Sequence, residues 1–237
     1  MQPPSFAGFS PETVRFLTEL EQNNDKLWFE ANRQRFEGQL MEPARDFVVA
    51  LGARLREIAP EVQADPRTDR SIFRLHRDTR FSPDKSPYKS HLGLWFWEGP
   101  GHRMSNPGFY FHLEPPNLMV AAGLHVFPKP FMEAYRRAVV DPQLGSELEA
   151  AVRAIVAHET YAFSAPQYKK TPRGFDPDHP RQRWLLHSGL SAGVEMEIPA
   201  WLYGSQIVDE CMRRYAELLP LHRWLVRVNQ TLEPETI

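Results

Sequence analysis

Four short runs of strand-like sequence between residues 72 and 127 constrain the fold most. They cover residues 72–77, 91–97, 108–113 and 118–127, and each alternates between two kinds of side chain. Groups of turn-forming residues separate them, at residues 82–84, 99–101 and 115–117. Parallel strands need a crossover connection of roughly a dozen residues or more, so links this short predict an antiparallel meander.

Successive side chains of a strand point to opposite sides, so each face of the predicted sheet can be described separately. The apolar face collects Phe73, Leu75, Leu92, Leu94, Phe96, Phe109, Phe111, Leu113, Leu118, Val120, Ala122, Leu124 and Val126. The mixed face collects Ile72, Arg74, His76, Trp95, Trp97, Tyr110, His112, Glu114, Met119, Ala121, Gly123 and His125. We expect helices to cover the apolar face. The mixed face suits either a ligand cleft or a solvated surface shielded by Trp and Tyr.

Helical patterns flank this sheet on both sides in the sequence. Ser10 and Asp25 stand where helix caps are expected, and a third helix begins near Pro43. Later helices are predicted over residues 130–140, 144–158, 206–218 and 221–228, with a short strand at 195–199. The predicted fold class is α+β, a mainly antiparallel sheet with N-terminal and C-terminal helices packed on it. We expect a single domain over residues 1–237, helical over 1–60, sheet-forming over 70–128 and mostly helical over 129–237.

Composition narrows the class of protein. The 237 residues are 42% hydrophobic, which is enough to build a core, and no stretch approaches the roughly 20 apolar residues that span a bilayer. A single cysteine, Cys211, cannot form an internal disulfide, and the first ten residues do not resemble a leader peptide. A soluble, cytoplasmic protein without a membrane partner is therefore expected. The formal net charge of −2 makes nucleic acid an unlikely partner without excluding it, and leaves the oligomeric state open.

The clearest candidate site is the segment of residues 72–94, which carries five basic and two acidic side chains, a local charge of +3. Arginine binds phosphate or carboxylate through a planar fork of donors, lysine adds a point charge, and a tyrosine hydroxyl can donate. The predicted anion-binding residues are Arg74, Arg77, Arg80, Lys85, Tyr88 and Lys89. Alternatively, Asp78 and Asp84 pair with the arginines and hold the loop in shape, or the loop is a surface for a partner protein.

His112 and Glu114 are the candidates for proton transfer, since two residues two apart share a face of a strand. Together with His76 or His125 they also resemble a set of metal ligands. A histidine on an aromatic face is more often simply hydrogen-bonded, and no helical His-x-x-x-His motif or cysteine pair is present. The sequence therefore predicts no metal and no cofactor.

Five blocks of the sequence are similar to those of an uncharacterised bacterial family, the domain of unknown function DUF2461. They are residues 23–29 (NNDKLWF), 73–82 (FRLHRDTRFS), 84–89 (DKSPYK), 110–115 (YFHLEP) and 172–180 (PRGFDPDHP). The blocks span most of the chain, and the central one is long and specific. The resemblance implies membership of that family and no particular activity.

Two classes of function remain after these arguments. The leading hypothesis is an anion-binding protein, with the possibility of an enzyme acting on a phosphorylated or carboxylated small molecule. The alternative is a non-catalytic module that binds nucleic acid or a protein through the same loop. Steep loss of affinity with salt would indicate binding to a phosphate backbone, whereas stabilisation by one compound would indicate a small-ligand site.

Overall fold

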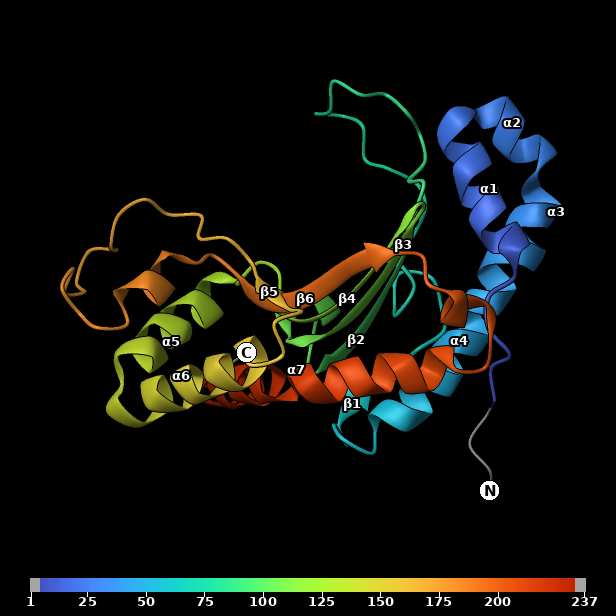
Figure 1. Ribbon diagram of the computed structural model, residues 1–237. Helices are drawn as coiled ribbons and strands as arrows, with labels where there is room; N and C mark the ends of the chain where they lie inside the picture. The colour runs from blue at the N-terminus through green and yellow to red at the C-terminus, as the bar shows by residue number, and fades with distance from the viewer. Residues whose placement is uncertain (1–4, 233–237) are drawn as a thin grey trace. The chain divides into compact units, whose positions relative to one another are not determined.

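The computed structural model describes residues 5–232, which form one six-stranded antiparallel sheet with helices before and after it in the chain (Figure 1). The strand order is β1-β2-β3-β4-β6-β5. The strands are β1 (Val62–Gln63), β2 (Leu92–Glu98), β3 (Gly108–Glu114), β4 (Asn117–Leu124), β5 (Ala162–Phe163) and β6 (Leu190–Glu197). The consecutive strands β2, β3 and β4 lie side by side, as expected of a meander. The predicted α+β class is confirmed.

Helices account for most of the remaining regular structure. They are α1 (Pro11–Gln22), α2 (Lys26–Ala31), α3 (Arg33–Arg35), η1 (Phe36–Met41), α4 (Glu42–Leu55), η2 (Arg103–Ser105), α5 (Lys129–Val140), α6 (Pro142–Val156), η3 (Gln182–Leu186), η4 (Ala200–Tyr203) and α7 (Ile207–Gln230). Asp25 caps α2 by accepting a hydrogen bond from the Trp28 amide at 2.9 Å, as predicted. Ser10 is the N-cap residue of α1, as predicted, but its side chain makes no capping hydrogen bond to the backbone.

The chain divides into two compact units. The first contains the residues up to Phe96, together with Tyr110–Val120 and Glu195–Arg214, and the second contains Trp97–Phe109, Ala121–Val194 and the residues from Tyr215 onward. The single domain expected from the sequence stays a prediction. Within residues 5–232, no helix combines the length and the apolar character that crossing a membrane would require.

The core of the first unit forms where aromatic side chains from α4 and β3 meet. Phe111 is fully buried, its ring centroid 5.0 Å from that of Phe47 and 6.0 Å from that of Phe9. Leu94 and Phe96 on β2 are also fully buried. Ring pairs at these spacings add roughly 0.5–1.5 kcal/mol each beyond simple burial. This packing fixes β2 and β3, the two strands that carry the candidate site.

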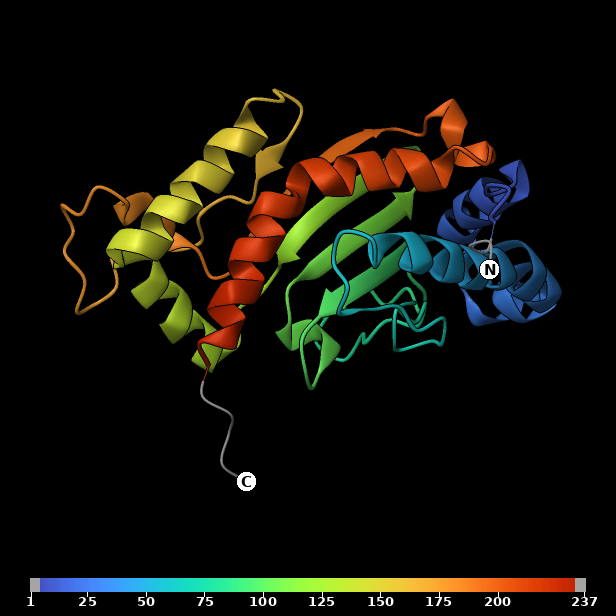
Figure 2. The same cartoon turned by 90° about the horizontal axis from the view of Figure 1, so that it is seen from below.

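The second unit has its own core between α5, α6 and the C-terminal part of α7, which lie alongside one another (Figure 2). Tyr135 is fully buried, and its hydroxyl donates a 2.8 Å hydrogen bond to the Trp184 carbonyl. Trp224 donates from its indole N–H to the Leu144 carbonyl at 2.8 Å. Both polar tips are therefore satisfied inside an otherwise apolar core.

The predicted apolar face agrees with the observed burial except at the two ends of the series. The side chains from Leu92 to Leu124 that were assigned to it are buried, but Val126 is 58% exposed because β4 ends at Leu124. At the other end Ile72 is buried and Phe73 contacts Tyr110, the reverse of the prediction. Phe73 therefore belongs to the mixed face.

Residues 72–77 do not form the predicted strand. They make only isolated bridges, of Ile72 with Thr68 and with Leu94 and of His76 with Tyr88. Pro87 has no amide hydrogen to donate, so the strand pairing that begins with the bridge between His76 and Tyr88 cannot extend past Pro87. This segment is consequently a loop that is fixed at a few points.

The C-terminal third also departs from the prediction. A full strand, β6, extends over Leu190–Glu197 where only residues 195–199 were expected, and the short β5 pairs with it. A single helix, α7, continues through Pro220 where two helices were predicted. A proline inside a helix costs about 3 kcal/mol, and the burial of Leu218, Leu221 and Leu225 on either side of Pro220 offsets that cost.

Candidate functional site

The loop between Phe73 and His91 is part of the first unit and projects away from the strands as a long segment without helix or strand (Figure 1). Two backbone hydrogen bonds close its base, from the Arg77 amide to the Pro87 carbonyl at 2.9 Å and from the Lys89 amide to the Leu75 carbonyl at 2.8 Å. Residues 78–86 therefore connect two short extended segments that are paired with each other.

Asn24, in the turn between α1 and α2, fixes this loop to the N-terminal helices. Its side-chain amide donates to the Tyr88 carbonyl at 2.9 Å and accepts from the Tyr88 amide at 3.0 Å. The side chain thus satisfies both backbone groups of one residue, as a neighbouring strand would. The Tyr88 ring stacks on Phe29 with centroids 4.1 Å apart.

Tyr88 was predicted to bind an anion, but the structure places it in packing. Its side chain belongs to an aromatic cluster with Phe29 and His76, and the residue is only 4% exposed. Burial raises the pKa of its hydroxyl. Tyr88 therefore holds the base of the loop.

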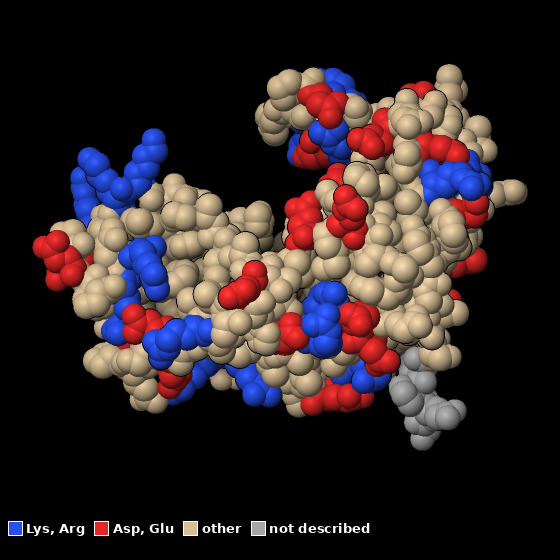
Figure 3. Space-filling model, in the orientation of Figure 1, with Lys and Arg blue, Asp and Glu red and all other residues tan. Residues whose placement is uncertain are grey.

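Two of the predicted anion-binding arginines form ion pairs inside the loop. Arg80 makes a bidentate contact with Asp78, at 2.9 Å from Nε and 2.7 Å from Nη2, and Arg77 pairs with Asp84. Hydrogen bonds from Ser86 and Arg77 hold the pKa of Asp84 below its ordinary value, and those from Arg80 do the same for Asp78. Acidic and basic atoms are accordingly mixed at this loop in the space-filling view (Figure 3).

The other three cations of the segment make different contacts. Arg74 is exposed, and its charge also helps to lower the pKa of Asp78. Lys85 donates to the Thr79 carbonyl at 2.9 Å. The Lys89 ammonium lies 5.6 Å from the centroid of the Phe73 ring, within the range of a cation–π contact.

A cluster of four polar side chains lies on β2 and β3 beside Lys89. Tyr110, His112 and Glu114 occupy alternate positions of β3 and so share one face. The Tyr110 hydroxyl is 2.8 Å from His112 Nδ1, and His112 Nε2 is 3.1 Å from Glu114 Oε2. His91, directly before β2, places its ring centroid 4.4 Å from that of His112 and its Nδ1 3.7 Å from Glu114 Oε1.

Burial and neighbouring charges decide the protonation states in this cluster. Burial, reinforced by His112 and Lys89, lowers the pKa of His91 to about 4, so its imidazole is neutral near pH 7. Burial raises the pKa of Tyr110 to about 12, which keeps the phenol protonated. The hydrogen bond with His112 lowers the pKa of Glu114, which is therefore a carboxylate. The cluster therefore contains the neutral imidazole of His91 and the anionic oxygens of Glu114.

His91 is the member of this cluster that the sequence analysis did not single out. His91 and Trp95 are four residues apart on the same predicted strand, so their side chains lie on the same face, the mixed one. This spacing could have identified His91 from the sequence. His76 packs with Tyr88 instead, and His125 is exposed just after β4. Neither joins the cluster as the sequence had suggested.

Gly93 makes room for this arrangement. A β-carbon at that position would lie 3.0 Å from the Tyr110 hydroxyl and 3.1 Å from the Phe73 ring. Both contacts are tighter than side chains ordinarily accept. The absence of a side chain at Gly93 therefore lets Tyr110 reach His112.

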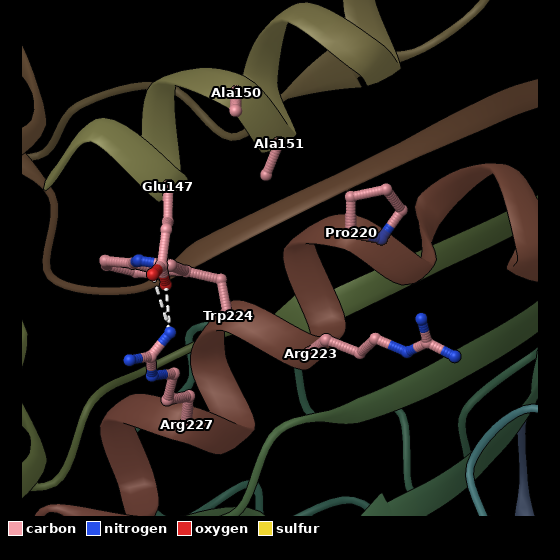
Figure 4. Close-up of a pocket in the computed structure, with 7 residues that line it drawn as sticks. All are labelled: Glu147, Ala150, Ala151, Pro220, Arg223, Trp224 and Arg227. Atoms are coloured by element: carbon pink, nitrogen blue, oxygen red, sulfur yellow. Dashed lines mark hydrogen bonds and ion pairs between the residues drawn. The ribbon is translucent and has the colours of Figure 1, made fainter. Parts of the chain in front are cut away.

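A separate pocket of about 420 Å³ lies in the second unit between α6 and α7 (Figure 4). It is lined by Glu147, Ala150, Ala151, Pro220, Arg223, Trp224 and Arg227. Glu147 accepts two 2.6 Å hydrogen bonds from Arg227, and Arg223 extends away from that pair. Its walls are mainly apolar, and none of the predicted site residues lines it.

The second unit also contains a buried ionisable pair. His222 is fully buried on α7, and its Nε2 is 2.7 Å from Glu98 Oε2. Its ring lies 4.2 Å from that of Phe109, and its Nδ1 has no hydrogen-bond partner. Burial lowers the pKa of His222. Neither residue was noticed in the sequence, because their pairing joins positions 124 residues apart.

Comparison with known families supports the resemblance seen in the motifs. The model of the family described as "Conserved hypothetical protein (DUF2461)" matches residues 12–224, so the chain belongs to that family. No curated protein matches the chain.

Proposed function

We propose that this member of the DUF2461 family binds a small anionic molecule, phosphorylated or carboxylated, at the base of the loop of residues 74–89. Arg74, Lys85 and Lys89 are the cations that contact it. Arg77 and Arg80 serve mainly to hold the loop in shape, and Tyr88 fixes its base. Some residues of the loop then bind the anion, and others hold the loop in shape.

One observation carries the proposal. Both acidic side chains of the segment are engaged with arginines, Asp78 with Arg80 and Asp84 with Arg77. The segment holds five cations and two acids, so a charge of +3 is not balanced within it. Cations held close together repel one another, and an anion that binds among them relieves this repulsion.

The polar cluster on β2 and β3 supports the same location. Lys89 is close enough to His91 for its charge to lower the pKa of that histidine. A ligand held by Lys89 would therefore lie beside His112 and Glu114, the groups first considered for proton transfer. A cytoplasmic location stays a prediction.

Thermal unfolding in the presence of anions tests this proposal. Phosphate, sulfate, citrate and a panel of phosphorylated metabolites are added at constant ionic strength to the wild type and to Lys89→Ala. At 100 times the dissociation constant a ligand stabilises the folded protein by about 2.7 kcal/mol. For a chain of this size that raises Tm by roughly 5–11 °C. The gain should shrink in Lys89→Ala and persist in Lys170→Ala, a change at an exposed lysine outside the loop.

Two results would count against a small-anion site. One is that none of the anions stabilises the wild type. The other is equal stabilisation of Lys89→Ala and Lys170→Ala. Binding to nucleic acid that weakens steeply between about 50 and 200 mM salt, without stabilisation by small anions, would favour the alternative of a nucleic-acid module.

A further inference from the structure

We propose that His91, His112 and Glu114 bind a divalent transition-metal ion, with coordination positions left open on the solvent side. This inference goes beyond anion binding and does not depend on it. It also departs from the prediction of no metal, which was made because no helical His-x-x-x-His motif or cysteine pair is present and which did not consider His91.

The three side chains converge closely enough to share one ion. One ligand atom from each lies within 4.8 Å of the others. His112 Nε2 and Glu114 Oε2 are 3.1 Å apart, and His91 Nδ1 is 3.7 Å from Glu114 Oε1. Ligands about 2.1 Å from a tetrahedral metal are roughly 3.4 Å from one another. Side-chain movements of about 1 Å would therefore bring the three ligand atoms to that spacing.

Hydrogen bonding accounts for the position of His112 more fully than for that of His91. His112 has a partner at each ring nitrogen, Tyr110 on one side and Glu114 on the other. The 3.7 Å between His91 and Glu114 is longer than an ordinary hydrogen bond. A metal ion at the centre of the three groups would give His91 a strong interaction and would use the Glu114 carboxylate at the same time.

Tyr110 supplies the kind of outer contact that orients a metal-binding histidine. Its hydroxyl lies 2.8 Å from His112 Nδ1, the nitrogen away from Glu114. A hydrogen bond at that nitrogen fixes the orientation of the ring and leaves Nε2 to bind the ion. Tyr110 is a positioning residue in this arrangement, because it acts through His112.

The donor set and the exposure select the class of ion. Two imidazole nitrogens and one carboxylate suit zinc, ferrous iron and similar ions, whereas magnesium and calcium prefer oxygen ligands. The His112 side chain is 15% exposed, that of His91 25% and that of Glu114 53%. Solvent therefore reaches the cluster, so water or another ligand can complete the coordination.

Charged groups near this site both favour and oppose the binding of a cation. The Glu114 carboxylate attracts a cation, while the positive charge of Lys89 near His91 opposes it. An ion of charge +2 next to one carboxylate keeps a net positive charge. An anionic ligand bound to the metal would remove that excess and would also be attracted by Lys89.

Titration with Co²⁺ tests the site, with visible absorption and calorimetry as readouts. The full chain is prepared without a histidine tag and stripped with a chelator. We expect one Co²⁺ per chain, displacement by Zn²⁺, and a rise in Tm on binding. Affinity should fall at least 100-fold in His112→Ala and in Glu114→Gln, and about 10-fold in Tyr110→Phe. His125→Ala is the matched control, because it removes an exposed histidine outside the cluster and should bind as the wild type does.

Two outcomes would overturn the proposal. One is that the wild type binds neither Co²⁺ nor Zn²⁺ at about 100 µM, a concentration on the order of the dissociation constants of weak metal sites. The other is that Glu114→Gln and His125→Ala bind the ion with equal affinity. Glu114→Gln keeps the size of the side chain, so circular dichroism should show an unchanged fold, and His91→Ala provides a second variant if it does not. Lys89→Ala separates the two proposals, because it should weaken anion binding while leaving Co²⁺ affinity intact or higher.

Discussion

Replacing Asn24 with alanine should loosen the candidate site without touching any of its ligand-binding groups. The Asn24 side chain makes two hydrogen bonds to the backbone of Tyr88, at 2.9 and 3.0 Å. Tyr88 is followed directly by Lys89, and His91 lies three residues after Tyr88. The variant therefore tests whether the N-terminal helices fix the base of the loop.

The expected magnitude follows from those two bonds. A hydrogen bond in a protein contributes about 0.5–1.5 kcal/mol net, so losing two should lower the free energy of unfolding by about 1–3 kcal/mol. For a chain of 237 residues, a loss of about 2 kcal/mol lowers Tm by roughly 4–8 °C. Amides of the loop should also exchange with solvent faster, because local opening becomes easier.

Urea denaturation and hydrogen exchange would measure both effects. Asn23→Ala is the matched control, since Asn23 makes one exposed side-chain bond, to the Glu19 carbonyl of its own helix. We expect it to change stability by no more than about 0.5 kcal/mol. If Asn24→Ala is as stable as Asn23→Ala and its loop amides exchange no faster than in the wild type, the argument that Asn24 anchors the loop is wrong.

Three further predictions concern the packing inside the two units. Phe111→Ala removes a fully buried ring and should cost about 3–5 kcal/mol in chemical denaturation, whereas Phe81→Ala, at a 92% exposed residue, should be nearly neutral. His222 has a lowered pKa when folded, so its contribution to stability is complete above the unfolded value of about 6.5 and falls as the pH drops below it. Urea melts at pH 7.5 and 5.5 should therefore show a smaller loss for His222→Gln than for the wild type, and an equal loss would contradict the assignment. Gly123→Ala would place a β-carbon 2.3 Å from the Leu190 carbonyl and should prevent normal folding, while Gly101→Ala, also at positive φ but in open space, should cost only about 1–2 kcal/mol; soluble yield and Tm distinguish the two.

Alternation predicted the apolar face at the centre of the sheet correctly, although Trp95 and Trp97 on the other face of β2 are buried as well. On β2 the side chains of Leu92, Leu94 and Phe96 are all fully buried, as their spacing indicated. The strand β6 was largely missed because its first half contains Ser191, Ala192 and Gly193, which have weak strand preference. That segment pairs in the sheet because of its neighbours, and a local pattern cannot show this.

The candidate site could be predicted only in part for a similar reason. His112 and Glu114 lie two apart on one strand, so the sequence placed them on one face correctly. Adding His91 requires the register between β2 and β3, which the sequence does not determine. The ion pairs of Arg77 with Asp84 and of Arg80 with Asp78 were foreseen as an alternative, because acids and arginines are close in the sequence.

Anomalous diffraction from crystals grown with Zn²⁺ tests the central claim, a ligand site on this face of β2 and β3, most directly. The account predicts a peak about 2.0–2.2 Å from a nitrogen of His91, a nitrogen of His112 and an oxygen of Glu114. It also predicts that a phosphate or carboxylate added to the crystal appears beside that peak, toward Lys89. Zinc bound elsewhere, with His112 still hydrogen-bonded to Glu114 and His91 apart from both, would contradict it.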